Sequence, residues 1–218
     1  MAKSTASPTQ RVLNIWAIVL ILWSIYRVTF HTDLPIWFDE CIAKPLIFLF
    51  PVFWYITKFE KKPFWSGVGL TGKRIGRELL FGLSVGSVFV ILAIGVRLMK
   101  HGGFPTFSLA PSSLIWILST CAAACTEQLL STGFVFHRLI DESKNMIKPV
   151  LLSACLFFFL HVPALFGVEK IANATLIPMI ALNVVLSIMT SIVFIMRKNT
   201  SAAIVIQALY LLSLPILL

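Results

Sequence analysis

The chain has 218 residues, of which 58% are hydrophobic and 12% are charged, whereas about 25% of the residues in a typical soluble domain are charged. This composition excludes an ordinary soluble enzyme and predicts an integral membrane protein. The formal net charge is +9, but the basic residues stand between apolar segments. We therefore attribute the charge to membrane topology and expect no nucleic-acid partner.

Seven segments approach the roughly 20 apolar residues that a membrane-spanning helix needs. In chain order they are residues 12–30, 41–57, 79–99, 112–138, 149–168, 173–196 and 201–218. The second contains Lys44 and Pro51, and the last is short. For each of these two segments, the alternative to a complete membrane span is a re-entrant segment. We predict an all-α transmembrane bundle of about seven helices, with residues 1–218 forming a single transmembrane domain.

The distribution of Lys and Arg predicts an orientation. With a cytoplasmic N-terminus, thirteen of the eighteen lie on the cytoplasmic side and five lie on or near the outer side. Lys44 and Arg27 are among these five, as residues at outer helix ends. This positive-inside bias predicts a cytoplasmic N-terminus and an outer C-terminus. The expected location is the plasma membrane if the organism is prokaryotic, with membrane lipid as a partner.

Four polar side chains inside the apolar segments share one depth. At the rise of roughly 1.5 Å per residue of an α-helix, Glu127 lies about 16 Å and His161 about 18 Å from the cytoplasmic helix ends. Gln207 lies about 14 Å and Asn183 about 21 Å from those ends. Polar groups from four helices at one depth predict a shared interior pocket. For Asn183 we favour the alternative of ordinary hydrogen bonding between helices.

Glu127 and His161 carry the functional hypothesis. A carboxylate and an imidazole can hold a water molecule, with the carboxylate as general base, and the hydroxide then attacks a carbonyl group. Gln207 would donate an N–H to the oxyanion that forms. The structural alternative is a protonated, hydrogen-bonded Glu127 and a His161 that only joins two helices. Because the pair supplies only two ligands, we expect no metal ion and no cofactor.

The stretch "EQLLSTG" carries a resemblance to a known family. The CPBP intramembrane proteases, which include CAAX proteases and bacteriocin self-immunity proteins, have a first motif of Glu-Glu-x-x-x-Arg, usually followed by Gly. This chain is similar at Glu127 and Gly133, but has Gln128 in place of the second Glu and Thr132 in place of the Arg.

The other two motifs of the CPBP family fall in the same order along the chain. The second, Phe-x-x-x-His, is matched in full by Phe157 and His161. The third, His-x-x-x-Asn, falls on Gln207 and Leu211, and neither residue matches the motif. The resemblance covers two nested ranges, 64–218 for the whole similarity and 112–218 for the motifs.

The resemblance also implies roles for these residues. Glu127 and His161 take the positions that activate water, Gln207 replaces an oxyanion-binding His, and Leu211 replaces a donor Asn. The expected substrate pocket comprises four motif positions, Gln128, Thr132, Phe157 and Leu211, together with Asn183, which lies at the same depth. Losing one donor of an oxyanion hole costs about 10²–10³ in rate. The candidate substitute donors are Ser131, Thr132, Asn183 and Tyr210.

The implied function is that of an intramembrane glutamic endopeptidase, which hydrolyses a peptide bond of a membrane-associated or lipidated, CAAX-like protein or peptide. Because several motif positions differ, the alternative is a catalytically impaired member that binds a membrane partner, as a scaffold or as a bacteriocin-immunity-type protein. A small transporter with Glu127 as its proton site is a third hypothesis. We disfavour it because the sequence shows neither an internal repeat nor a broken helix pair.

Overall fold

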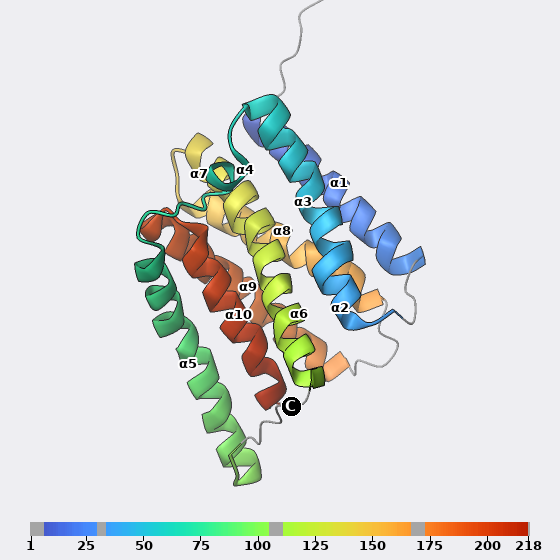
Figure 1. Cartoon of the computed structure of the whole chain (residues 1–218), viewed down its shortest axis with the longest axis vertical. Helices are drawn as coiled ribbons and strands as arrows, with labels where there is room; N and C mark the ends of the chain where they lie inside the picture. Colours follow the sequence, from blue (N-terminus) through green and yellow to red (C-terminus); the bar gives the residue numbers. More distant parts are fainter. Residues whose placement is uncertain (1–6, 30–33, 105–110, 167–172, 218) are drawn as a thin grey trace, which may run out of the picture.

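The computed structural model describes residues 7–29, 34–104, 111–166 and 173–217, and these residues form a helical bundle without strands (Figure 1). Each of the seven predicted segments corresponds to one long helix, which confirms the all-α membrane bundle. Residues 30, 167–168 and 218, at the ends of three predicted segments, lie outside the described residues.

The long helices follow one another along the chain, and two of them combine α-helical and π-helical parts. They are α1 (Pro8–Thr29); α2 (Ile36–Phe38), η1 (Asp39–Ala43), α3 (Lys44–Tyr55) and η2 (Ile56–Glu60) in one unbroken helix; α5 (Ile75–His101); α6 (Pro111–Gln128), η3 (Leu129–Phe136) and α7 (His137–Glu142) in another; α8 (Ile147–Phe166); α9 (Asn173–Arg197); and α10 (Thr200–Leu217). A short helix, α4 (Phe64–Gly67), lies in the connection before α5.

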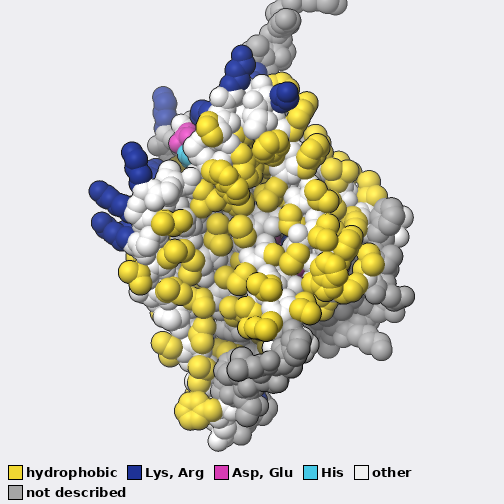
Figure 2. All heavy atoms as spheres, in the orientation of Figure 1, with side chains coloured by type: hydrophobic (Ala, Val, Ile, Leu, Met, Phe, Trp, Pro, Cys, Tyr) yellow, Lys and Arg dark blue, Asp and Glu magenta, His cyan; other side chains and the backbone are white. Residues whose placement is uncertain are grey.

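The described surface is that of an integral membrane protein. Three helical stretches, Pro8–Thr29, Ile75–Lys100 and Ser112–Glu142, are long and apolar enough to cross a membrane, and three shorter apolar helices accompany them. Large apolar side chains cover most of the face seen in Figure 2, whereas Lys and Arg gather toward one end. We call this the basic end; α1 and α5 begin there. Glu127 and Gln207 are buried within this otherwise largely apolar interior, so polar groups lie inside the bundle while apolar side chains face outward.

The helix at residues 36–60 runs unbroken through Pro51, so a re-entrant turn does not form there. Lys44 lies about two turns inside this helix, counted from Ile36, and is only 7% exposed. The prediction that Lys44 stands at an outer helix end is therefore wrong. Its charge does not report on topology, because it is paired inside the bundle rather than solvated at the membrane surface.

Helix α6 lies between α3 on one side and α10 on the other (Figure 1). On its far side α10 packs closely against α5, because Gly82 and Gly86 leave room there. A Cβ added to Gly82 would lie 2.8 Å from the Cβ of Val205, and one added to Gly86 would lie 2.6 Å from Cδ1 of Leu209. Small residues one helical turn apart allow such close approach of membrane helices. This packing fixes α10 and, with it, Gln207.

A loop of the basic end is docked against η3. A Cβ added to Gly133 would lie 2.5 Å from the carbonyl oxygen of Val68, so only glycine allows this contact between two backbones. The Thr200 hydroxyl donates to the same carbonyl over 2.7 Å. Nearby, Arg138 donates to both carboxylate oxygens of Glu60, over 2.6 and 2.8 Å. These contacts hold the segment that follows Glu127.

Candidate active site

Glu127 lies near the end of α6, deep in the bundle, and is 5% exposed. One residue later the backbone changes to the π-helical η3, all of whose residues are buried. The Ser131 hydroxyl donates to the Glu127 carbonyl over 2.7 Å at this change. Such π-helical segments are rare and occur frequently at functional sites. Glu127 therefore lies where the continuous helix α6–η3–α7 changes from α-helical to π-helical geometry.

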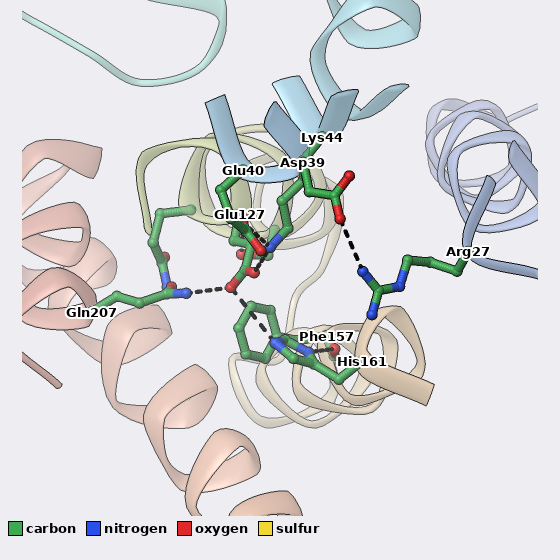
Figure 3. Close-up of polar contacts among 10 residues, drawn as sticks. Arg27, Asp39, Glu40, Lys44, Glu127, Phe157, His161 and Gln207 are labelled. Carbon is green, nitrogen blue, oxygen red and sulfur yellow. Dashed lines mark hydrogen bonds and ion pairs between the residues drawn. The ribbon is translucent and has the colours of Figure 1, made fainter. Parts of the chain in front are cut away.

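The carboxylate of Glu127 has partners from three other helices (Figure 3). Lys44 of α3 lies with its Nζ 2.6 Å from Oε1. The side-chain amide of Gln207, on α10, donates to Oε2. The Nε2 atom of His161, on α8, lies 3.6 Å from the same Oε2. The structure thus brings together the three residues to which we assigned catalytic roles, and adds a lysine that we had not assigned to the site.

The orientation of His161 is set within its own helix. Its Nδ1 lies 2.9 Å from the carbonyl oxygen of Phe157. Because a carbonyl oxygen only accepts, Nδ1 carries a proton, and in the neutral imidazole Nε2 presents its lone pair toward Glu127. The ring also packs on Phe157, with the centroids 4.7 Å apart. The side chain of His161 keeps 27% of its surface exposed, so the site is accessible from this side.

A chain of hydrogen bonds continues from Glu127 into the core. Gln207 accepts from the amide of Gln128, and the oxygen of that amide accepts from the Thr132 hydroxyl over 2.5 Å. Gln128, Thr132 and Gln207 are all fully buried or nearly so. Since Glu127 can only accept while it is ionised, it fixes the direction of every donor in this chain.

Two of the predicted pocket residues lie apart from these contacts. Leu211 packs against an apolar cluster that includes Leu186 and Tyr210. Asn183 is half-buried on α9, and among the described residues it makes no hydrogen bond to Glu127, His161 or Gln207. Of the substitute donors, Ser131 and Thr132 are already used in the bonds described above.

Lys44 is the site residue that the sequence reasoning missed. Besides Glu127, its ammonium pairs with Glu40, one turn earlier in the same helix, over 2.8 Å, and it lies 5.8 Å from the centre of the Trp23 ring. One signal was available in the sequence. A carboxylate at membrane depth needs a cation, and Lys44 is a rare lysine within an apolar segment.

One family comparison identifies the second half of the chain. The family model described as type II CAAX prenyl endopeptidase Rce1-like matches residues 109–212. Residues 109–212 are therefore similar to the Rce1-like family of CAAX proteases. The resemblance to the CPBP proteases is thereby confirmed. The matched segment contains Glu127, His161 and Gln207, but not Lys44. No curated protein and no solved structure matches the chain.

Two positions of the first motif carry uncharged residues in this chain. Gln128 and Thr132 stand at the positions of the second Glu and the Arg of the CPBP pattern, four residues apart on consecutive turns of one helix. Here their side chains are joined by a hydrogen bond of 2.5 Å. Both charges of the motif are therefore absent, and the two side chains contact each other as neutral groups.

Proposed function

We propose that this protein, whose residues 109–212 match the Rce1-like family model, is an intramembrane endopeptidase in which Glu127 and His161 activate a water molecule. The substrate class is a membrane-associated or lipidated, CAAX-like protein or peptide. The observation that carries the proposal is the separation of 3.6 Å between Nε2 of His161 and Oε2 of Glu127. This is beyond direct hydrogen-bond length, but a water molecule about 2.8 Å from each atom bridges them.

Such a water donates one hydrogen bond to Glu127 and one to the lone pair of His161 Nε2. Both of its protons are then held, and its oxygen lone pairs face the scissile carbonyl carbon. As the C–O bond forms, the proton passes to Glu127, which later delivers it to the leaving amine. Gln207 uses one N–H on Glu127, and its second amide hydrogen is the donor that we assign to the oxyanion.

We further propose that the N-terminus is cytoplasmic, the C-terminus is on the outer side, and the basic end faces the cytoplasm. The support is the excess of Lys and Arg at that end. Lys44 no longer counts in this comparison because it is buried and paired. In a prokaryote, the membrane concerned is the plasma membrane.

The test is peptide cleavage by the purified protein in lipid vesicles, with a prenylated peptide ending in a CAAX-type sequence as substrate. Glu127→Gln and His161→Ala should each lower kcat by about 10²–10⁴, because each removes a participant in proton transfer. Met99→Ala is the control, since Met99 is exposed on α5 and should cleave like the wild type. Equal cleavage by all four proteins would refute the assigned roles.

A second candidate function is binding of a membrane partner without catalysis. The observation in its favour is that Leu211 offers no donor where the family has an Asn, while Thr132 and Gln128 are uncharged. In this case Glu127→Gln leaves crosslinking to the partner unchanged, whereas the bulky substitution Thr132→Trp in the pocket abolishes it. Cleavage by the wild type that is lost in Glu127→Gln, with crosslinking unchanged, would instead favour the endopeptidase.

A further inference from the structure

We propose that Lys44 is a positioning residue of the candidate active site, which keeps Glu127 ionised and turns its free oxygen toward His161. The inference rests on the proposed function, because it concerns the same carboxylate. It adds a residue from the N-terminal helices to a site otherwise built within the matched range 109–212.

The contacts of Lys44 show that it acts through Glu127 and not on substrate. Its ammonium has three protons, and carboxylate oxygens of Glu127 and Glu40 lie 2.6 and 2.8 Å from it. The face of Trp23, itself 3% exposed, covers a further side of the ammonium at 5.8 Å. With Lys44 itself 7% exposed, a substrate does not reach its ammonium.

The charge of Lys44 explains how an ionised carboxylate persists at this depth. An unpaired carboxylate in an apolar interior becomes neutral by taking up a proton, and a protonated Glu127 cannot accept the proton of a water molecule. A buried cation in contact removes this obstacle. Because the ammonium contacts Oε1, Oε2 is left to face Gln207 and His161.

Glu40 completes the arrangement. It lies one turn before Lys44 on the same helix, and its carboxylate contacts the ammonium beside that of Glu127 (Figure 3). The pocket thus contains two carboxylates and one cation, although the first motif supplies only Glu127. The charges absent at Gln128 and Thr132 have counterparts in Glu40 and Lys44, which come from a different helix.

Infrared difference spectroscopy of the protein in lipid vesicles tests the inference without a substrate. Subtracting the spectrum of Glu127→Gln from that of the wild type should reveal an ionised carboxylate band for Glu127. In the Lys44→Met background, the same subtraction should reveal a protonated carboxyl band. An ionised band in both backgrounds would overturn the proposal.

The matched control is Arg197→Met. Arg197 donates to both oxygens of Glu78 over 2.8 and 2.7 Å and so joins α9 to α5. This substitution also breaks an ion pair, which is partly buried, but at the basic end and away from Glu127. The ionised band of Glu127 should persist in the Arg197→Met background. Its disappearance would show that general loosening of the bundle, rather than loss of Lys44, changes the band.

Cleavage gives a second readout. Lys44→Met should lower kcat at least 10-fold with KM unchanged, Lys44→Arg should retain more activity, and Lys44→Met should have no further effect in the Glu127→Gln background. An additional loss in that background, or a change in KM alone, would contradict a role through Glu127. If no protein cleaves while the infrared bands change as expected, the endopeptidase proposal fails and the placement of Lys44 stands.

A folding defect in Lys44→Met would not prevent the test. The double variant Lys44→Met/Glu127→Gln buries neither charge of the pair, so it should fold at least as well as Lys44→Met alone. If Lys44→Met lowers the melting temperature as much in the Glu127→Gln background as in the wild type, then Lys44 stabilises the bundle independently of Glu127, and the proposal is wrong.

Discussion

Thr132 and Gln128 are uncharged residues at motif positions where the CPBP pattern has Arg and Glu, and their side chains contact each other. Their hydrogen bond is one link in a chain that ends at Glu127, through Gln207. Each amide in the chain uses its oxygen and its nitrogen on different partners, so a missing donor at one end leaves an acceptor unpaired inside the bundle. The hydroxyl of Thr132 does not contact Gln207, but it supports the orientation of Gln207 through the amide of Gln128.

Thr132→Val tests this link at nearly constant side-chain volume. It removes the hydroxyl and leaves the oxygen of Gln128 without its donor, so the free energy of unfolding should fall by about 1–3 kcal/mol. The measurement is equilibrium unfolding of the detergent-solubilised protein. Thr132→Ser keeps the hydroxyl and should lose less stability. If the valine variant is as stable as the wild type, the chain of hydrogen bonds does not stabilise the bundle.

At the scale of an element, the continuous helix α6–η3–α7 is fixed beside the Val68 loop by a glycine that allows close contact. The motif glycine, Gly133, is required because the carbonyl of Val68 lies where its Cβ would be. The loop that carries Val68 is bound in turn by Thr200, at the start of the helix that bears Gln207. One contact between backbones thus links the helices of Glu127 and Gln207.

Gly133→Ala should destabilise the bundle and lower cleavage. The new Cβ would lie 2.5 Å from a backbone oxygen, so the loop must shift, at a cost of about 1–3 kcal/mol. Gly95→Ala is the control, because a Cβ there has no neighbour within 4 Å. Alanine favours a helix by about 1 kcal/mol over glycine, so thermal unfolding should show Gly95→Ala equal to or above the wild type. Equal melting of Gly133→Ala would contradict the tight contact.

On the scale of the whole molecule, basic side chains and apolar surface occupy different parts of the protein. Lys and Arg gather toward the basic end, and apolar side chains cover most of the face in view (Figure 2). Two ion pairs at that end join helices: Arg197 with Glu78 between α9 and α5, and Arg138 with Glu60. In the proposed orientation, the exposed Lys73, Arg74 and Arg77 lie at the cytoplasmic membrane surface.

Cysteine labelling of intact cells tests that orientation. In a variant without the four native cysteines, Gly103→Cys lies at the far end of the bundle and Lys144→Cys lies between α7 and α8 at the basic end. A membrane-impermeant maleimide should label Gly103→Cys in intact cells, and Lys144→Cys only after permeabilisation. The reverse pattern would mean that the basic end faces outward.

The sequence by itself determined the class of fold and the family. Apolar segments of spanning length predict helices whatever their neighbours, because a bilayer leaves the backbone few alternatives. The motif order led to the CPBP family, and the shared depth of Glu127, His161 and Gln207 predicted that they share a pocket. These predictions rest on local pattern and spacing, which the sequence shows without any knowledge of the contacts between helices.

Only the tertiary structure decided which charge stands next to Glu127. Lys44 is separated from it by more than eighty residues of sequence, and its place near the start of the predicted segment 41–57 led us to interpret it as a topological lysine at a helix end. Its burial depends on where α3 packs against α6, which no local spacing specifies. The direction of the hydrogen bonds from Thr132 to Gln207 was hidden for the same reason. Contacts between helices are set by packing of the whole bundle. That packing places the ammonium of Lys44 against the carboxylate of Glu127.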